Sequence, residues 1–238
     1  IIKTGSAMKI CIIPARGGSK RILRKNIKEF NGKPIIAYSI EAALNSGLFS
    51  EVMVSTEDDE IAEISRYYGA EVPFMRPDHL ADDFASTPDV MEHAATWLNS
   101  IEDKPSFICC IAATAPLIDS HYLKAGLQKI LHGQCDYAIS AVSYPSPIQR
   151  AFRITDDERI EMFFPENFHK RSQDLEAVYH DAGQFYWGKT QAWLTKKLLF
   201  SHETAPVLLP MIQVQDIDTL EDWDIAELKC KILHHDNK

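Results

Sequence analysis

A short basic loop near the start of the chain is the first feature that could bind an anion. Arg16, Lys20, Arg21, Arg24 and Lys25 place five cationic side chains within ten residues of a protein whose formal charge is -9. The two glycines that follow Arg16 allow backbone N–H groups to approach phosphate oxygens closely. The spacing fits neither GxxxxGK followed by Ser or Thr nor GxGxxG, which excludes a P-loop and a dinucleotide fingerprint. A phosphate site and a solvated basic turn remain as alternatives.

Two carboxylates near the end of the chain could bind a hard cation. Asp216 and Asp218 flank Ile217, and alternation along an extended segment points both carboxylates to the same side. Mg²⁺ prefers one or two carboxylates together with substrate phosphate oxygens. The alternative is helix capping, because Asp218 or Thr219 could cap a helix that begins at Leu220. The pattern by itself favours capping.

A polar loop from Arg76 to Thr87 lies between a strand-like and a helix-like segment. It could line a nucleotide pocket, with Thr87 and Pro88 marking the start of the helix. The simpler alternative is a capped helix preceded by a solvated acidic turn. The nine histidines include no HExxH or paired Cys/His spacing, and GxSxG is absent, so zinc and serine-hydrolase sites are excluded.

Composition narrows the class of partner and the compartment. An acidic chain with a pI near 5.5 provides no general attraction for nucleic acid or anionic lipid, and no apolar stretch approaches the roughly 20 residues of a membrane span. The five cysteines show no CxxC spacing, which favours the reducing cytoplasm. Residues 1–7 lack signal-peptide features, and we interpret them as an appended segment before a natural start at Met8.

The remaining pattern predicts an α/β protein with one domain over 8–238. Strands and helices alternate, which is typical of a mainly parallel sheet flanked by helices, with ligands at the carboxyl ends of the strands. Predicted strands are 9–14, 51–55, 70–75, 106–112, 137–144, 184–187 and 207–209, and predicted helices are 34–46, 58–68, 89–101, 119–131 and 219–233. The stretch of about 145–181 is too long for a simple connection and predicts an inserted arm.

Several motifs together resemble the CMP-sialic acid synthetase family. The first is Ile13-Pro14-Ala15-Arg16-Gly17-Gly18-Ser19-Lys20-Arg21 with Lys25-Asn26. The resemblance continues through Asn31-Gly32-Lys33-Pro34, Val54-Ser55-Thr56, Arg76-Pro77, Leu80-Ala81, Ala113-Thr114-Ala115-Pro116-Leu117 and Asp216-Ile217-Asp218-Thr219. The pseudaminic acid branch looks most similar, through Ser19-Lys20-Arg21-Ile22, Tyr144-Pro145-Ser146-Pro147-Ile148-Gln149-Arg150 and His180-Asp181-Ala182-Gly183-Gln184.

The resemblance implies a Rossmann-like nucleotidyltransferase fold and a homodimer whose arms exchange between subunits. It implies a Mg²⁺-dependent cytidylyltransferase that transfers CMP from CTP to the anomeric hydroxyl of pseudaminic acid, a nine-carbon sugar acid, for surface glycan or flagellin glycosylation. Sialic, legionaminic or an eight-carbon keto-deoxy acid is the alternative acceptor. An inactive nucleotide-sensing module is the alternative of a different class.

The resemblance also assigns roles by position. The expected catalytic residues are Arg16, Lys25, Asp216 and Asp218, of which the two aspartates bind the metal. The expected nucleotide contacts are Ala15, Arg16, Gly17, Gly18, Ser19, Lys25, Asn26, Arg76 and Thr87. The expected sugar contacts are Ala112, Thr114, Arg171 and Gln184. Two residues depart from the family pattern: Leu23 stands where Pro is usual, and Ala112 stands where sialic acid enzymes carry Gln.

Overall fold

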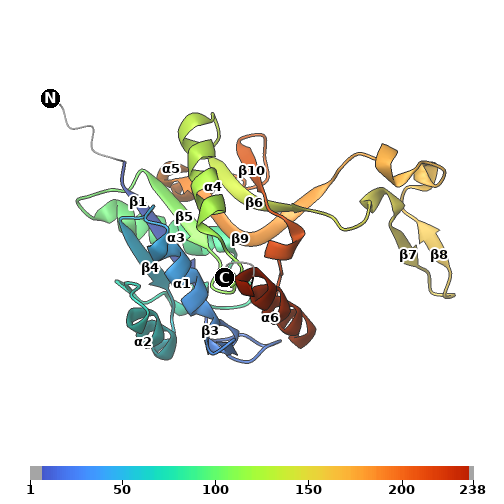
Figure 1. Ribbon diagram of the computed structural model, residues 1–238. Coiled ribbons are helices and arrows are strands. Elements are labelled where there is room, and N and C mark those ends of the chain that lie inside the picture. Colours follow the sequence, from blue (N-terminus) through green and yellow to red (C-terminus); the bar gives the residue numbers. More distant parts are fainter. Residues whose placement is uncertain (1–6, 236–238) are drawn as a thin grey trace.

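A six-stranded sheet forms the centre of the computed structural model, which describes residues 7–235 (Figure 1). Its strands are β1 (Lys9–Pro14), β4 (Glu51–Ser55), β5 (Phe107–Ile111), β6 (Tyr137–Ser143), β9 (Tyr179–Lys189) and β10 (Thr204–Leu208). They lie in the order β10-β6-β9-β5-β1-β4. Only β9 runs antiparallel to its neighbours β5 and β6 among these described strands. The predicted mainly parallel sheet is confirmed.

Helices cover both faces of the sheet. The helices are α1 (Ile35–Asn45), α2 (Asp59–Tyr67), α3 (Thr87–Ser100), α4 (Ser120–His132), α5 (Thr190–Leu194) and α6 (Leu220–His235). Helices α1, α2 and α4 share one core cluster with Cys11 and Ile13 of β1, whereas α3 and α5 share another with Ile10 and Ile12. Alternate side chains of this continuous apolar strand therefore supply both cores, as expected for a strand buried on both faces.

A third core cluster connects the two chemically interesting segments. Ile22 of the basic loop and Ile217 of the acidic segment are both buried in it, together with Trp223 of α6. The short strands β2 (Glu29–Phe30) and β3 (Lys33–Pro34) form a hairpin that contributes Phe30 to the same cluster. Apolar packing thus fixes the basic loop against the segment that carries Asp216 and Asp218.

One local prediction was wrong, and one helix was missed. Residues 70–75 form only isolated parallel bridges, Glu71 to Met53 and Met75 to Thr56, instead of a strand. Pro73 between them has no backbone N–H to donate to a ladder. Helix α5 was not predicted, because a stretch of five residues is too short to show helical periodicity.

Between β6 and β9 the chain leaves the sheet and projects from the body of the molecule (Figure 1). This segment contains the hairpin of β7 (Phe152–Ile154) and β8 (Ile160–Met162), with short 3-10 turns on either side. The predicted arm of 145–181 includes it, although residues 179–181 belong to β9. No helix of the described residues is long and apolar enough to cross a bilayer. The predicted appended segment, 1–7, lies outside the described residues except for Ala7.

Candidate active site

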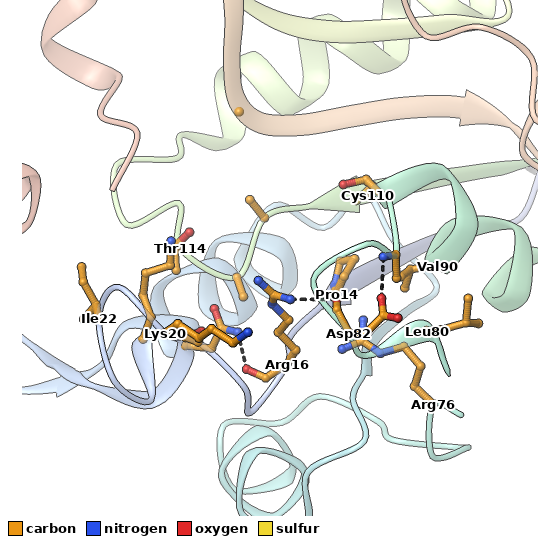
Figure 2. A pocket seen from close by; sticks show the side chains of 18 of the residues that line it. Pro14, Arg16, Lys20, Ile22, Arg76, Leu80, Asp82, Val90, Cys110 and Thr114 are labelled. Carbon is orange, nitrogen blue, oxygen red and sulfur yellow. Dashed lines mark hydrogen bonds between the residues drawn. The ribbon is translucent and has the colours of Figure 1, made fainter. Parts of the chain in front are cut away.

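A cavity of about 320 Å³ opens at the carboxyl ends of β1 and β5. In Figure 2, Arg16 lies between Lys20 and Asp82, while Cys110 lies at the opposite edge from Lys20. Eight of the residues predicted from the sequence line this cavity: Arg16, Ser19, Lys25, Asn26, Arg76, Thr87, Ala112 and Thr114. The position agrees with the rule that ligands gather beyond the carboxyl ends of parallel strands.

Four of the five cations of the basic loop line the cavity, and Arg24 does not. Arg24 adopts a left-handed backbone conformation with φ 55° and pairs with Asp58 and Glu60 at the start of α2. The hydrogen bonds from Arg24 lower the pKa of the Asp58 carboxyl, which also caps α2 by accepting from the N–H of Ile61 at 3.0 Å. Arg24 therefore anchors the loop to α2, and the other cations face the cavity.

The loop that precedes α3 supplies counterions for two of these cations. Arg16 donates hydrogen bonds to the carbonyl oxygen of Asp82 at 2.8 Å and to Oδ1 of Asp83 at 2.9 Å. Lys20 pairs with the second carboxylate oxygen of Asp83. These contacts hold the pKa of Asp83 below its usual value, with Lys20 the largest cause. The carboxylate of Asp83 thus pairs with two cations that are suited to bind phosphate.

Glu57 organises the first residues of the basic loop. It accepts from the backbone N–H of Gly17 at 2.7 Å and pairs with Arg76, also at 2.7 Å. Arg76, which is 5% exposed, donates in addition to the carbonyl oxygen of Ala15 at 3.1 Å. A Cβ at Gly17 would lie 2.3 Å from a carboxylate oxygen of Asp58. Gly17 is therefore required for close packing, and its N–H faces Glu57 here.

Arg76 retains one unused donor beside the cavity. Its Nε atom is buried and has no hydrogen-bond partner among the described residues. Thr87, on the same side of the cavity, occupies the first turn of α3, which Ser86 and Asp89 cap reciprocally. The sequence left pocket lining and helix capping as alternatives for this loop, and different residues of the loop do each. Ser86 caps the helix, whereas Thr87 and Arg76 face the cavity.

The basic loop reaches the acidic segment directly. Lys25 donates to the carbonyl oxygen of Ile217 at 2.6 Å and lies 3.5 Å from Asp218, and Arg21 pairs with Asp218 at 2.7 Å. Asn26 donates to the carbonyl oxygen of Arg16 at 2.9 Å, which shapes the loop from inside. The cations and the acidic segment, distant in sequence, form one polar assembly.

Capping of α6 falls to Thr219 and not to Asp218. Thr219 Oγ1 accepts from the N–H of Asp222 at 3.2 Å, and Asp222 accepts from the N–H of Thr219 at 2.8 Å. This reciprocal pair is a capping box. Asp218 is therefore available for ion pairing. Asp216 is exposed, Ile217 between the two aspartates is buried, and neither aspartate lines the cavity itself.

The predicted sugar contacts separate in the structure. Ala112 and Thr114 line the cavity. Gln184 is buried outside it, where its amide nitrogen donates to the carbonyl oxygen of Gln213. Arg171 lies on the projecting arm and pairs with Asp174 at 2.7 Å. Neither Gln184 nor Arg171 reaches the cavity of its own chain.

The residues near the cavity that were not predicted as site residues include Glu57, Cys110 and Tyr186. Glu57 follows the end of β4, and Cys110 and Tyr186 are paired opposite each other on β5 and β9. Cys110 and Tyr186 line the cavity. The place of Glu57 just after a parallel strand is a signal that could have identified it. Tyr186 carries no such signal, because its strand runs in the opposite direction.

Comparisons with known proteins point to one family. A family model described as Cytidylyltransferase matches residues 10–203. A curated relative from Campylobacter jejuni, named pseudaminic acid cytidylyltransferase, is 45% identical over 94% of this chain and 97% of its own. One from Escherichia coli, named N-acylneuraminate cytidylyltransferase, is 32% identical over 91% of this chain and 51% of its own.

A solved structure gives independent support for the fold. It is a CMP:2-keto-3-deoxy-manno-octonic acid synthetase complexed with CTP, with a TM-score of 0.68 over 96% of this chain and all of the other, at 15% identity. At that identity the likeness concerns the fold alone. The match over residues 10–203, together with the nearly full-length relatives, establishes that this chain belongs to the cytidylyltransferase family.

Proposed function

We propose that this protein transfers CMP from CTP to the anomeric hydroxyl of pseudaminic acid, giving CMP-pseudaminic acid and pyrophosphate. The observation that carries the proposal is the 45% identity to a relative of that name over 97% of its length, against 32% for a relative named for N-acylneuraminate. The cavity supports it with a basic wall for phosphates and a less charged end near Ala112 and Thr114.

The cations of the basic loop are suited to hold the triphosphate. Arg16 and Lys25 contact its oxygens, while Ser19 and Asn26 keep the loop in shape. Ala15, Gly17 and Gly18 belong to the same loop but do not line the cavity, and Gly18 has open space where a Cβ would lie. Arg76 and Thr87 line the part of the cavity that we assign to cytidine.

The reaction requires little covalent participation by the protein. The anomeric hydroxyl releases its proton to solvent as its oxygen bonds to the α-phosphorus in line. The bond to the pyrophosphate oxygen breaks in the same step, and pyrophosphate leaves with both electrons of that bond. The guanidinium of Arg16 and the ammonium of Lys25 neutralise charge that develops on the phosphates. Positioning and electrostatic stabilisation provide most of the acceleration in phosphoryl transfer.

The cofactor of the proposal is Mg²⁺, held by Asp216 and Asp218. Among residues 7–235, no group of three or more His, Cys, Asp or Glu side chains is placed to hold a metal by itself. Two carboxylates on one side of an extended segment fit Mg²⁺ provided that substrate phosphates complete its coordination. A bound Mg²⁺ supplies charge neutralisation and orients the phosphate chain. Asp218 must exchange its pairing with Arg21 for the cation.

The arm leads us to propose a homodimer in which arms exchange between subunits. Apolar side chains on it are largely exposed, including Phe152 at 53%, Ile154 at 74% and Phe168 at 64%. Such a surface is unusual on a soluble monomer. Exchange would also bring Arg171 toward the partner's cavity, where it can contact the sugar carboxylate. Sedimentation at micromolar concentration should show a dimer, and a fully active 27.0 kDa species would contradict the model.

The setting of this reaction is proposed to be the cytoplasm, with neither nucleic acid nor a membrane as partner. The net charge of -9 supports this, as do the buried thiols of Cys11, Cys109, Cys110 and Cys135, which form no disulfides.

Pyrophosphate release with a panel of nucleotides and sugar acids tests the proposed function. We expect release with CTP and a nine-carbon sugar acid, and at most slow release with ATP, GTP or UTP. Turnover of sialic acid or another sugar acid but not of pseudaminic acid would move the assignment to the alternative acceptor. No turnover of any sugar acid would favour a nucleotide-sensing module.

A further inference from the structure

Strand β9 is irregular where it passes the sugar end of the cavity. Its pairing with β6 shifts register between Ile139 and Ala141, and Gly183 adopts φ 65°. The hydroxyl of Ser140, which is fully buried, accepts from two backbone N–H groups of β9 at 3.2 Å each. Bulges of this kind re-aim side chains next to active sites.

The bulge fixes the carboxylate of Asp181. Oδ1 accepts from the backbone N–H of Gly183 at 2.8 Å, and Oδ2 accepts from the phenol of Tyr186 at 2.6 Å. Both carboxylate oxygens therefore have a defined partner. Because the N–H of Gly183 is a donor that cannot rotate, it sets the orientation of the whole carboxylate.

The phenol of Tyr186 can take only one hydrogen-bonding role toward a ligand. A phenol carries one hydrogen and lone pairs on the same oxygen. Burial, together with the nearby Asp181, raises the pKa of Tyr186, so the phenol keeps its proton at neutral pH. Since that hydrogen is donated to Asp181, the oxygen can only accept a hydrogen bond from a further group.

The phenol lies where the acceptor sugar is expected. Tyr186 lines the cavity, and it is paired in register with Cys110, two residues before Ala112. Gly183 lines the same wall, whereas the cations of the basic loop belong to another segment. An oxygen that only accepts suits an amide N–H, because an amide nitrogen only donates, while a hydroxyl can adapt to either polarity.

We propose that Asp181 is a positioning residue that holds the Tyr186 phenol as a hydrogen-bond acceptor for an acylamido N–H of the sugar. This rests on the proposed function, in which the acceptor carries two acylated nitrogens. Asp181 thereby selects acylamido sugars without touching them.

Asparagine at position 181 provides a sharp test. The amide oxygen can still accept from Gly183, which leaves the amide nitrogen facing the phenol. Tyr186 must then accept from that nitrogen and direct its own hydrogen into the cavity, toward the sugar N–H. We expect D181N and Y186F each to lower kcat/KM for the sugar by about 5- to 150-fold, the range for a desolvated donor left unpaired. KM for CTP should stay within about twofold.

The double variant distinguishes positioning from direct contact. If Asp181 acts through Tyr186, D181N combined with Y186F should equal Y186F alone, and the thermal midpoints of all variants should lie close together. Additive losses would overturn the proposal, as would a rise in KM for CTP with the sugar KM unchanged, which would place the phenol against cytosine.

Sugar analogues identify the donor. In each of two analogues, one acylamido N–H is replaced by an ester oxygen. For the wild-type enzyme, one analogue should show the same loss in kcat/KM that Y186F shows with the parent sugar, and the other should show no loss. Y186F should show no further loss with the first of these analogues. If the wild-type kcat/KM for both analogues equals that for the parent sugar, the proposal fails. Wild-type turnover of the parent sugar is measured first, so that failure of the proposed function is seen separately. Should another sugar acid be the substrate, its acylamido analogues are used instead.

Discussion

The ammonium of Lys25 donates to the carbonyl oxygen of Ile217 at 2.6 Å and lies 3.5 Å from the carboxylate of Asp218. These residues are separated by 192 positions in the chain. The contact makes the basic loop and the acidic segment a single polar wall, with buried Ile22 and Ile217 packed behind it. A triphosphate bound to the loop would therefore lie beside Asp218, one of the two carboxylates proposed to hold Mg²⁺.

Asparagine substitutions of these carboxylates should remove turnover and largely spare stability. We expect D216N or D218N to lower kcat by about 100-fold or more, the scale typical for loss of an electrostatic stabiliser. The pairs that Asp218 forms with Arg21 and Lys25 are partly exposed, so their loss should cost less than about 1 kcal/mol of unfolding free energy. Steady-state assays and urea unfolding measure the two effects.

Thr219→Ala is the matched control for these variants. It removes the hydroxyl that caps α6, which should cost about 0.5 to 2 kcal/mol while most activity is kept. If D218N instead lost stability and kept its turnover, the metal assignment would be wrong.

Arg16→Lys should impair the use of CTP. A guanidinium can bind phosphate oxygens through two parallel N–H groups, and an ammonium cannot reproduce this geometry. We expect kcat/KM for CTP to fall by about 10- to 150-fold, as for the loss of a hydrogen bond to a charged group. Arg66→Lys on α2, outside the cavity lining, is the control. Equal loss in both variants would argue against a phosphate contact.

Asp83→Asn should strengthen nucleotide binding. Its carboxylate pairs with Arg16 and Lys20, and CTP must displace it from those cations. Because the pairs are exposed, the gain should be modest, with Kd for CTP lowered about two- to fivefold in calorimetry. A weaker Kd would mean that Asp83 positions Arg16 for the nucleotide and does not compete with it.

Acid stability should depend on the cap of α3. Hydrogen bonds from Ser86 and a contact with Lys196 lower the pKa of Asp89 to about 2. Because this value lies below the unfolded pKa of about 3.9, the stabilisation is fully present above that pH and is lost as the pH falls toward 2. In urea unfolding, D89N should differ from wild type at pH 6 and converge with it near pH 2. A constant difference down to pH 2 would contradict this assignment.

Local pattern predicted most of the sheet and helices because their signals lie within a few residues. The apolar run at 9–14 became β1, and the periodic stretch 58–68 became α2, which Asp58 caps. The arm was predicted from length and composition. The stretch 70–75 was misassigned because strand propensity does not register the donor that Pro73 lacks.

The site was only partly predictable because several of its contacts are long-range. The positive φ of Arg24 turns it toward Asp58 at the start of α2, 34 residues away, and no local pattern indicates this contact. Likewise, the bulge at Gly183 re-aims Asp181 and Tyr186, and simple alternation along β9 could not show which side chains face the cavity. Gln184 was expected at the sugar from the family resemblance, and it is buried against Gln213.

The most direct test of the account is kcat/KM for pseudaminic acid and for N-acetylneuraminic acid, measured side by side with CTP and Mg²⁺. Ala112 lines the cavity without the amide that sialic acid enzymes are expected to offer a glycerol-like tail. A buried hydroxyl left unpaired costs about 1 to 3 kcal/mol, which corresponds to roughly 5- to 150-fold in kcat/KM. The account predicts pseudaminic acid to be preferred by a factor in this range. Equal or faster turnover of N-acetylneuraminic acid would contradict it.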